Sequence, residues 1–247
     1  MNPEQIAHAG RILQKANFVV ALTGAGMGKP SGIPDFRSED GEWSRNSMEL
    51  ASLTNFRTNP QSFFNWLRPL MEHILAAKPN PAHSALAKLE KAGKLKAVIT
   101  QNIDSLDREV GLQEVYEMHG STRTATCVLC QTQVSAQLLI EPIRQGHLPK
   151  CPCGGILKPD ITLFEESLPY LALIKAQQAM EKCDALLVAG SSLVVNPVAS
   201  FPQLALRNGA PIIIVNFSET YLDRYAEVIL REDVAKAIPA IVEAALV

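Results

Sequence analysis

The stretch from Phe18 to Gly28 reads FVVALTGAGMG, an apolar, β-branched run that ends in three closely spaced glycines. A run without polar alternation predicts a strand buried on both faces, as in a parallel sheet. The glycines let the backbone approach a phosphate closely and point several N–H groups at it. The third glycine of a dinucleotide fingerprint would fall on Lys29, and Pro30 resists the helix that should follow, so an ordinary dehydrogenase start is not expected. A tight turn that uses glycine only for positive φ is the alternative.

Three further apolar runs, at 95–100, 185–190 and 211–216, predict strands of the same kind. Helical patterns surround them at 3–15, 60–76, 82–91, 171–182, 198–207 and 234–245. This alternation predicts an open α/β sheet. Residues 31–80 contain no clear strand and residues 127–155 hold four of the five cysteines, so both stretches are interpreted as insertions into the sheet domain.

The composition is that of an ordinary globular protein, because 47% of residues are apolar and 19% are charged. A net charge of −2 excludes an overall positive charge that would bind nucleic acid, although a local basic patch is still compatible with it. Glu4 stands where a signal peptide needs a basic region, so a cytoplasmic protein is expected. The stretch between Asp184 and Arg207 is uncharged but contains too many polar residues and prolines for a membrane span.

Short segments rich in polar residues and glycine follow three more of the predicted strands. They are Gln101, Asn102, Ile103 and Asp104 after the second strand, Gly190, Ser191 and Ser192 after the third, and Asn216 after the fourth. Open α/β sheets bind ligands at this edge, and together these residues predict an extended, dinucleotide-sized ligand. Asp104 could equally be the N-cap of a short helix at 105–110, and the serines could form a simple turn.

Two further features are typical of a ligand-binding or catalytic site. Asp35, Phe36 and Arg37 follow one another in a proline-stiffened segment that suits a lid over a cationic or planar ligand, or else a surface loop with a salt bridge. His119 lies beside Gly120, and a histidine with an ordinary pKa near 6.5 is the natural base for a sugar hydroxyl. A structural histidine is the alternative.

The cysteines form two knuckles, Cys127-x-x-Cys130 and Cys151-x-Cys153. Four thiolates in this arrangement predict a tetrahedral structural zinc with no open position for catalysis, against free thiols or disulfides. The residues between the knuckles include few basic and no aromatic ones, which argues against a nucleic-acid-binding ribbon. Cys183 is expected to be a buried structural thiol.

Taken together, the motifs resemble those of the sirtuins, the NAD-dependent protein-lysine deacylases. The matching residues run along nearly the whole chain: Thr23 to Gly26, Ser31 to Arg37, Thr100 to Asp104, His119-Gly120, the four cysteines, Lys158 to Ile161, Phe164, Gly190 to Leu193, and Val215-Asn216. The resemblance implies a Rossmann-like domain of residues 1–34, 81–123 and 157–247. A helical insertion (35–80) and a zinc ribbon (124–156) would form the small domain, with NAD and acyl-lysine meeting in the cleft between.

The family also implies roles for single residues. NAD would be held by Gly24, Ala25, Gly26, Asp35, Phe36, Arg37, Gln101, Asn102, Ile103, Asp104, Gly190, Ser191, Ser192 and Asn216. Asn102 and Asp104 would act at the nicotinamide ribose and the nicotinamide amide. His119 would be the base that activates a ribose hydroxyl after the acyl oxygen has displaced nicotinamide, and the products would be O-acyl-ADP-ribose and free lysine.

The substrate peptide would add as a strand between two segments, which include Thr162, Leu163 and Phe164 on one side and Leu193 and Val194 on the other. Desuccinylase-type sirtuins share a Tyr and an Arg that align here with Leu67 and Leu70. An apolar pocket would leave a succinyl carboxylate unpaired, so acetyl or other uncharged acyl groups are expected.

Three residues depart from the family pattern: Gly28 replaces a usual serine, Asp107 a usual histidine, and Glu165 a usual glycine. Two other function classes stay open. One is an ADP-ribosyltransferase that uses the same glycosidic cleavage. The other is a non-catalytic NAD or ADP-ribose binding module, against which the joint presence of His119, Asn102 and Asp104 argues.

Overall fold

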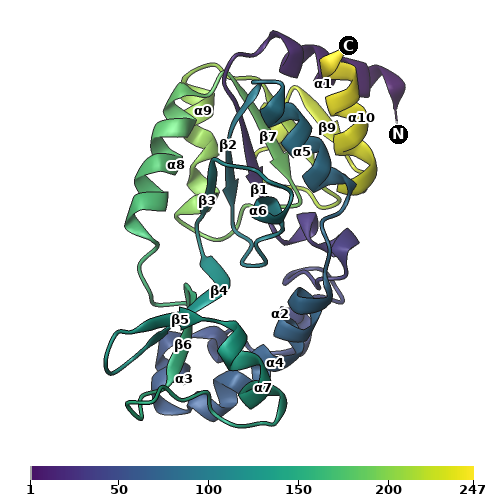
Figure 1. Cartoon of the computed structure of the whole chain (residues 1–247). Helices are drawn as coiled ribbons and strands as arrows, with labels where there is room; N and C mark the ends of the chain where they lie inside the picture. Colours follow the sequence, from purple (N-terminus) through teal and green to yellow (C-terminus); the bar gives the residue numbers. More distant parts are fainter. Residues whose placement is uncertain (1) are drawn as a thin grey trace.

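The computed structural model describes residues 2–247 and consists of a larger and a smaller lobe (Figure 1). The larger lobe contains a six-stranded sheet in the order β3-β2-β1-β7-β8-β9, in which every neighbouring pair is parallel. The strands are β1 (Val19–Thr23), β2 (Leu95–Thr100), β3 (Val115–Glu117), β7 (Ala185–Ala189), β8 (Ile212–Val215) and β9 (Val228–Leu230). The strand order reverses direction at β1, where open α/β folds bind their ligands.

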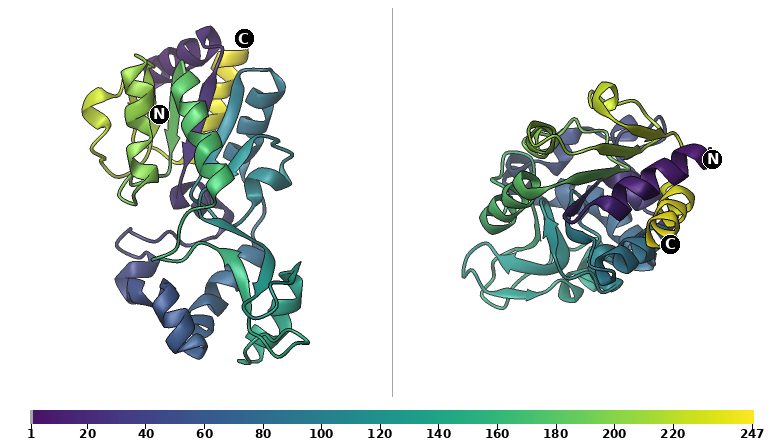
Figure 2. Two further views of the ribbon diagram at one scale, coloured as in Figure 1. Left: turned by 90° about the vertical axis from the view of Figure 1, so that its left-hand side faces the viewer. Right: turned by 90° about the horizontal axis from the view of Figure 1, so that it is seen from above.

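Helices cover both faces of this sheet (Figures 1 and 2). One face carries α1 (Pro3–Lys15), α5 (Pro81–Lys91) and α10 (Val234–Leu246), and the other carries α8 (Tyr170–Lys182) and α9 (Pro202–Arg207). Side chains of a strand alternate between faces, so Val19 and Ala21 of β1 pack in one core while Val20 and Leu22 pack in the other. No helix within residues 2–247 is long and apolar enough to cross a membrane.

The smaller lobe joins a helical part to a three-stranded antiparallel sheet. The helices are α2 (Glu42–Arg45), α3 (Leu53–Thr58) and α4 (Pro60–Ala76), and the sheet contains β5 (Gln133–Ser135), β4 (Gly120–Cys127) and β6 (Leu157–Ile161), with α7 (Gln137–Arg144) beside it. One hydrophobic core unites both parts, with Phe63 and Leu67 of α4 packed with Leu139 and Leu157. The left view of Figure 2 shows this lobe set apart from the parallel sheet.

The predicted α/β class and four predicted strands are confirmed. The predicted helix at 198–207 is divided into a 3₁₀ turn (Val198–Ser200) and α9, which begins at Pro202, because proline lacks the N–H that a continuous helix needs. Strands β3 and β9 were not predicted, since three residues are too few for a periodic pattern. After β1 the chain forms two 3₁₀ turns, Ala25–Met27 and Lys29–Ser31, in place of a long helix.

Candidate active site

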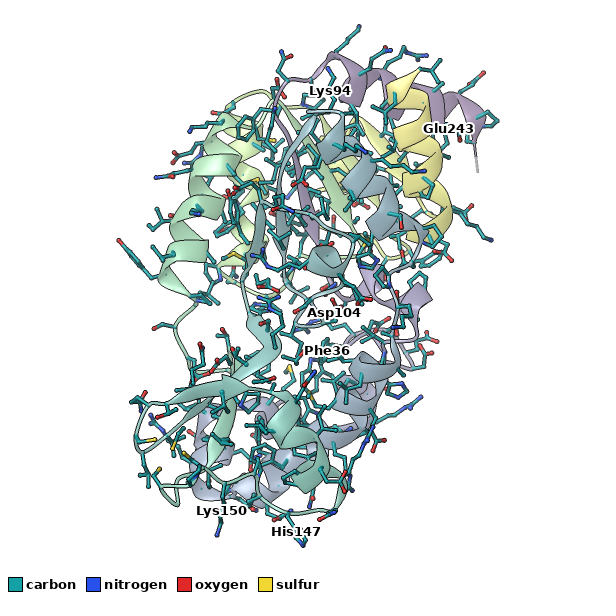
Figure 3. All side chains as sticks on the ribbon, viewed as in Figure 1. Phe36, Lys94, Asp104, His147, Lys150 and Glu243 are labelled. Atoms are coloured by element: carbon teal, nitrogen blue, oxygen red, sulfur yellow. The ribbon has the colours of Figure 1, made fainter. Side chains whose placement is uncertain are left out.

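A cavity of about 950 Å³ lies where the ends of the parallel strands face the smaller lobe. Its size is that of a pocket for a large ligand. Figure 3 labels Asp104 and Phe36 between the two lobes, and both line the cavity. All fourteen residues expected to bind the cofactor, together with His119, line the same space. The residues that the sequence placed at separate strand ends are thus brought together.

The glycine loop is shaped by close backbone contact with Gly190. The Gly24 N–H donates to Ala189 O at 3.1 Å and the Gly26 N–H to Gly190 O at 2.8 Å. A Cβ on Gly24 or Gly26 would lie 2.8 Å or 2.7 Å from backbone atoms of Gly190. Neither of these two glycines has a positive φ, whereas Gly190 has a φ of 60°. Glycine is therefore needed at 24 and 26 for close approach and not for positive φ, so the turn alternative is wrong for these two positions.

Carboxamide side chains fasten the neighbouring strand ends to one another. Gln101 Nε2 donates to Ser191 Oγ at 2.8 Å, and Asn102 Nδ2 donates to Gly24 O at 3.1 Å. Asn102 is buried, so its amide has few orientations open to it. These bonds hold the loops after β1, β2 and β7 as one surface beneath the cavity.

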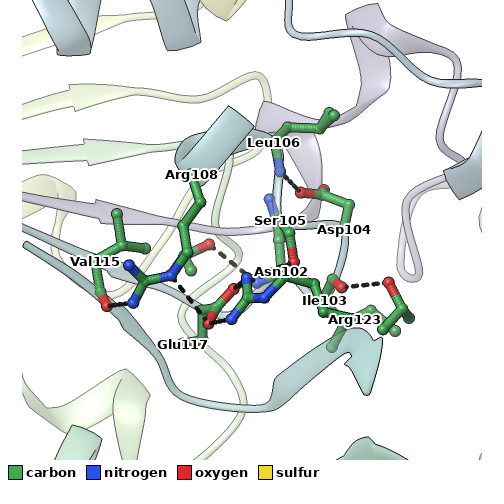
Figure 4. Close-up of polar contacts among 11 residues, drawn as sticks. Asn102, Ile103, Asp104, Ser105, Leu106, Arg108, Val115, Glu117 and Arg123 are labelled. Carbon is green, nitrogen blue, oxygen red and sulfur yellow. Dashed lines mark hydrogen bonds and ion pairs between the residues drawn. The ribbon is translucent and has the colours of Figure 1, made fainter. Parts of the chain in front are cut away.

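Asp104 sits on a loop that a polar network fixes in place (Figure 4). Its Oδ1 accepts from the Leu106 N–H at 2.9 Å, at the beginning of α6 (Leu106–Glu109), whose N-cap residue is Ser105 and not Asp104. The Thr122 hydroxyl donates to Ile103 O at 3.0 Å, on the other side of Asp104. Burial raises the pKa of Asp104 to about 6, with a further contribution from the charge of Glu117. The N-cap alternative for Asp104 is therefore wrong by one residue, although its carboxylate bonds the first turn of α6 and lines the cavity.

His119 is held with one ring nitrogen occupied. Its Nδ1 lies 2.9 Å from Gln101 O, and a carbonyl can only accept, so Nδ1 carries the proton and Nε2 is left as an acceptor. Burial lowers the pKa of His119 below its usual 6.5, against the opposing effect of the bond to Gln101. The ring is therefore neutral at pH 7, as a general base must be.

The segment that follows the second 3₁₀ turn is folded around Asp35. Asp35 Oδ1 accepts from the Ser38 N–H at 2.8 Å, and Oδ2 pairs with Lys29 Nζ at 3.0 Å. The Phe36 ring packs on Trp43 with centroids 5.2 Å apart, and Arg37 is exposed at the cavity edge. Asp35 therefore shapes the loop that presents Phe36 and Arg37 to the cavity, and the salt bridge of the surface-loop alternative is also present.

The four knuckle cysteines converge on one point. The sulfurs of Cys127, Cys130, Cys151 and Cys153 all lie within 4.8 Å of one another. The Cys127–Cys153 and Cys130–Cys151 pairs are 3.4 Å and 3.7 Å apart, close to the roughly 3.8 Å separation that Zn–S bonds of about 2.3 Å give in a tetrahedron. The cluster fits a structural zinc, and none of its members lines the cavity. Cys183 is buried in the core between α8 and the sheet, as expected.

The expected substrate residues divide into two groups. Leu70, Thr162, Leu163, Phe164 and Val194 line the cavity. Leu67 and Leu193 do not, because Leu67 is fully buried in the core of the smaller lobe and Leu193 packs in a core of the larger one. The face of α4 turned to the cavity carries Trp66, Leu70 and Ile74, which are spaced four residues apart. This four-residue spacing was a signal in the sequence that Leu67 lies on a different face of the helix from Leu70, and that Trp66 and Ile74 share the face of Leu70.

Phe217 is a cavity residue that the sequence did not single out. It follows Asn216, lines the cavity and is 66% exposed. Arg231 donates to the carbonyls on both sides of it, Asn216 O and Ser218 O, at 3.0 Å each. A large aromatic side chain directly after a strand-end polar residue was the available signal.

Comparison with known proteins identifies the family. The Sir2 family model matches residues 24–197. The NAD-dependent protein deacetylase of Sulfolobus acidocaldarius is 41% identical over 235 residues, which are 95% of this chain and 92% of the relative.

Solved structures agree along the whole chain. A structure solved for the mechanism and regulation of Sir2 enzymes has a TM-score of 0.93 and 40% identity, and it covers 99% of both chains. A Sir2 complex with a deacetylated p53 peptide and 3′-O-acetyl ADP-ribose has a TM-score of 0.92 and 35% identity, with 96% of both chains covered. Because the family model and these structures cover most of its length, this chain belongs to the Sir2 family, the sirtuins.

Proposed function

We propose that this protein uses NAD to remove acetyl or other uncharged acyl groups from protein lysines, with release of nicotinamide and O-acyl-ADP-ribose. The observation that carries the proposal is that one cavity unites the glycine loop, Asp104, a neutral His119 and an apolar wall from the smaller lobe. The Sir2 complex with deacetylated peptide and acetyl ADP-ribose supports the same chemistry. In this reaction the acyl group is transferred to ADP-ribose.

The cavity fits NAD as a co-substrate. The N–H groups of Ala25 and its neighbours would receive the pyrophosphate, and Ser191 would add a hydroxyl. Arg37, exposed at the edge, would cover the same charge. Asn216 and the adjacent Phe217 would hold the adenosine end.

At the other end, Gln101 and Asn102 would contact the nicotinamide ribose. The half-buried Asp104 carboxylate would accept from the nicotinamide amide N–H, with the Ile103 backbone beside it. Because Thr122 and Leu106 hold this loop on both sides, Asp104 would orient the ring without first reorganising. Phe36, packed on Trp43, would screen the reacting carbon from water and returning nicotinamide.

His119 would accept a proton from a ribose hydroxyl at Nε2. The bond from Nδ1 to Gln101 O fixes the tautomer that leaves Nε2 free to do so. The same bond stabilises the protonated ring that forms, since Nδ1–H continues to donate.

The substrate peptide would enter between the segments 162–166 and 193–196. Backbone hydrogen bonds would supply the affinity, so little sequence preference is expected. The acyl chain would meet Trp66, Leu70 and Ile74, with Leu70 the remaining member of the expected pair. A charged acyl group would lose its hydration against this wall without gaining a partner.

The lobes would serve as the two halves of this cleft. The division into residues 1–34, 81–123 and 157–247 against 35–80 and 124–156 is supported by the separate sheets and cores, except at two borders, because β6 (Leu157–Ile161) and the start of β4 at Gly120 belong to the sheet of the smaller lobe. Zinc at the four cysteines would hold the ribbon that carries β4 and β6. Thiolate ligands of this kind favour a reducing compartment, and the cytoplasm is part of the proposal.

The decisive experiment incubates the protein with an acetyl-lysine peptide, with and without NAD, and follows peptide mass, nicotinamide and O-acetyl-ADP-ribose together. One-to-one formation of free lysine, nicotinamide and O-acetyl-ADP-ribose is expected. His119→Ala should abolish formation of free lysine and O-acetyl-ADP-ribose, whereas His147→Ala, at an exposed histidine outside the cavity, should not. Nicotinamide release with ADP-ribose attached to protein would instead establish an ADP-ribosyltransferase. NAD binding without any turnover would indicate a binding module.

A further inference from the structure

Glu165 has a backbone conformation that its side chain does not favour. Its φ is 76°, in the left-handed region that residues with a Cβ rarely adopt. It lies in the segment 162–166 that lines the cavity. A residue stays in such a conformation only where its surroundings determine it.

The contacts that hold Glu165 in this conformation come from α3 in the helical part of the smaller lobe. Glu165 Oε2 accepts from the Thr54 N–H at 2.9 Å and from the Thr54 hydroxyl at 2.7 Å. Thr54 is the second residue of α3, so its N–H has no partner inside the helix, and a negative charge is favoured there. A single carboxylate oxygen therefore receives two donors from one residue 111 positions away in the sequence.

The backbone next to Glu165 is tied to the same helical segment. The Phe164 N–H donates to Ala51 O at 3.1 Å, and the Leu53 N–H donates to Phe164 O at 3.0 Å. At its other end the segment is tied to the catalytic region, since the Thr162 N–H donates to His119 O at 2.8 Å. Segment 162–165 thus spans from the carbonyl of His119 to the beginning of α3.

The second acidic residue of the segment is used differently. Glu166 Oε2 accepts from the Leu163 N–H at 2.8 Å and pairs with Lys158 at 2.9 Å, both within the β6 region. Of these two side chains, only that of Glu165 reaches the helical part of the smaller lobe.

We propose that Glu165 is a positioning residue that clamps segment 162–166 to α3 through Thr54 and so preforms one edge of the peptide groove. This inference rests on the proposed function, in which the peptide pairs with that segment. If this edge of the groove is already ordered, peptide binding does not have to include the entropy loss of ordering the loop, and the affinity is higher. Loss of the clamp should therefore weaken peptide binding and leave NAD binding and the chemical step unchanged.

The test compares steady-state kinetics of the wild type with Glu165→Gly and Thr54→Ala. Glycine removes the carboxylate and relieves the unfavourable φ, so the fold should be retained. Glu165→Gly should raise the KM for an acetyl-lysine peptide about five- to tenfold, the range expected for the net contribution of an ordinary hydrogen bond, and Thr54→Ala, which keeps the backbone donor, should raise it by less. The kcat and the KM for NAD should be unchanged in both. Thr58→Ala is the matched control, because it removes a hydroxyl from the same helix that bonds only Thr54 O.

The double variant separates a clamp from direct recognition. If Glu165 and Thr54 act as one unit, Thr54→Ala adds nothing in the Glu165→Gly background. A rise in KM for Glu165→Gly alone, largest for peptides with lysine or arginine beside the acetyl-lysine, would overturn the inference in favour of direct contact with the peptide. An unchanged peptide KM in both variants would also overturn it. If the wild type itself removed no acyl group, the proposed function would fail, and this inference with it.

Discussion

Asp107→Asn should stabilise this protein at alkaline pH. Asp107 is 2% exposed, and its Oδ1 has no hydrogen-bond partner. Burial, followed by the charge of Asp104, raises its pKa from 3.8 to about 7.

The sign and size follow from proton binding. Between pH 4 and 7 the folded protein keeps a proton on Asp107 that the unfolded chain has lost, so the free energy of unfolding falls as pH rises through this window. A shift of roughly three pKa units corresponds to about 4 kcal/mol, and the loss is complete only above pH 7. Asparagine never ionises. The stability difference between Asp107→Asn and the wild type should therefore grow from near zero at pH 4 to as much as about 4 kcal/mol at pH 8.

Urea unfolding at pH 4, 5, 6, 7 and 8 measures this difference. Glu109→Gln is the matched control, because Glu109 is an exposed carboxylate on the same short helix. A stability difference for Asp107→Asn that stays constant with pH, or that favours the wild type at pH 8, would refute the reasoning, since Asp107 would then be ionised and paired in the folded state.

Three further outcomes are expected. The kcat/KM for NAD should fall below about pH 6, because Asp104, with a pKa raised to about 6, must be ionised to accept from the nicotinamide amide, and an acid limb absent down to pH 5 would contradict that role. Gly190→Ala should lower the free energy of unfolding by roughly 2 to 4 kcal/mol and abolish NAD binding, because its Cβ would lie 2.4 Å from a backbone nitrogen. Gly111→Ala is the control in thermal unfolding, since its Cβ would meet open space, and it should cost only about 1 kcal/mol. Metal analysis should find one zinc per chain, and its removal by a strong chelator or by Cys151→Ser should lower the Tm; an unchanged Tm in the metal-free protein would exclude a structural role.

Local chemistry explains most of what could be predicted. Apolar runs that end in glycine or polar residues specify strand ends wherever they occur, so the residues after β1, β2, β7 and β8 were identified without knowledge of their neighbours. The cysteine knuckles likewise carry their own geometry, because ligand spacing within each knuckle limits where two sulfurs can lie.

The sequence-based predictions were incomplete or wrong where a segment was too short to show a period, or where tertiary packing decided which residues face the cavity. Strands of three residues have no detectable period, and Pro202 divided what the apolar spacing indicated as one helix. Leu67 and Leu70 lie close in the sequence, yet only Leu70 faces the cavity, because the rotation of α4 was set by the core that encloses Leu67.

The sequence by itself determined the α/β class, the zinc ligands and the set of residues at the strand ends, since each depends on neighbours within a few positions. Only the tertiary structure decided which side chains meet across long separations. The closeness of Gly26 to Gly190, the bond from His119 to Gln101 and the clamp between Glu165 and Thr54 all join segments that no local spacing relates. Their physical origin is the packing of two lobes around one cavity, which brings distant residues into contact and buries the charges whose pKa values then shift.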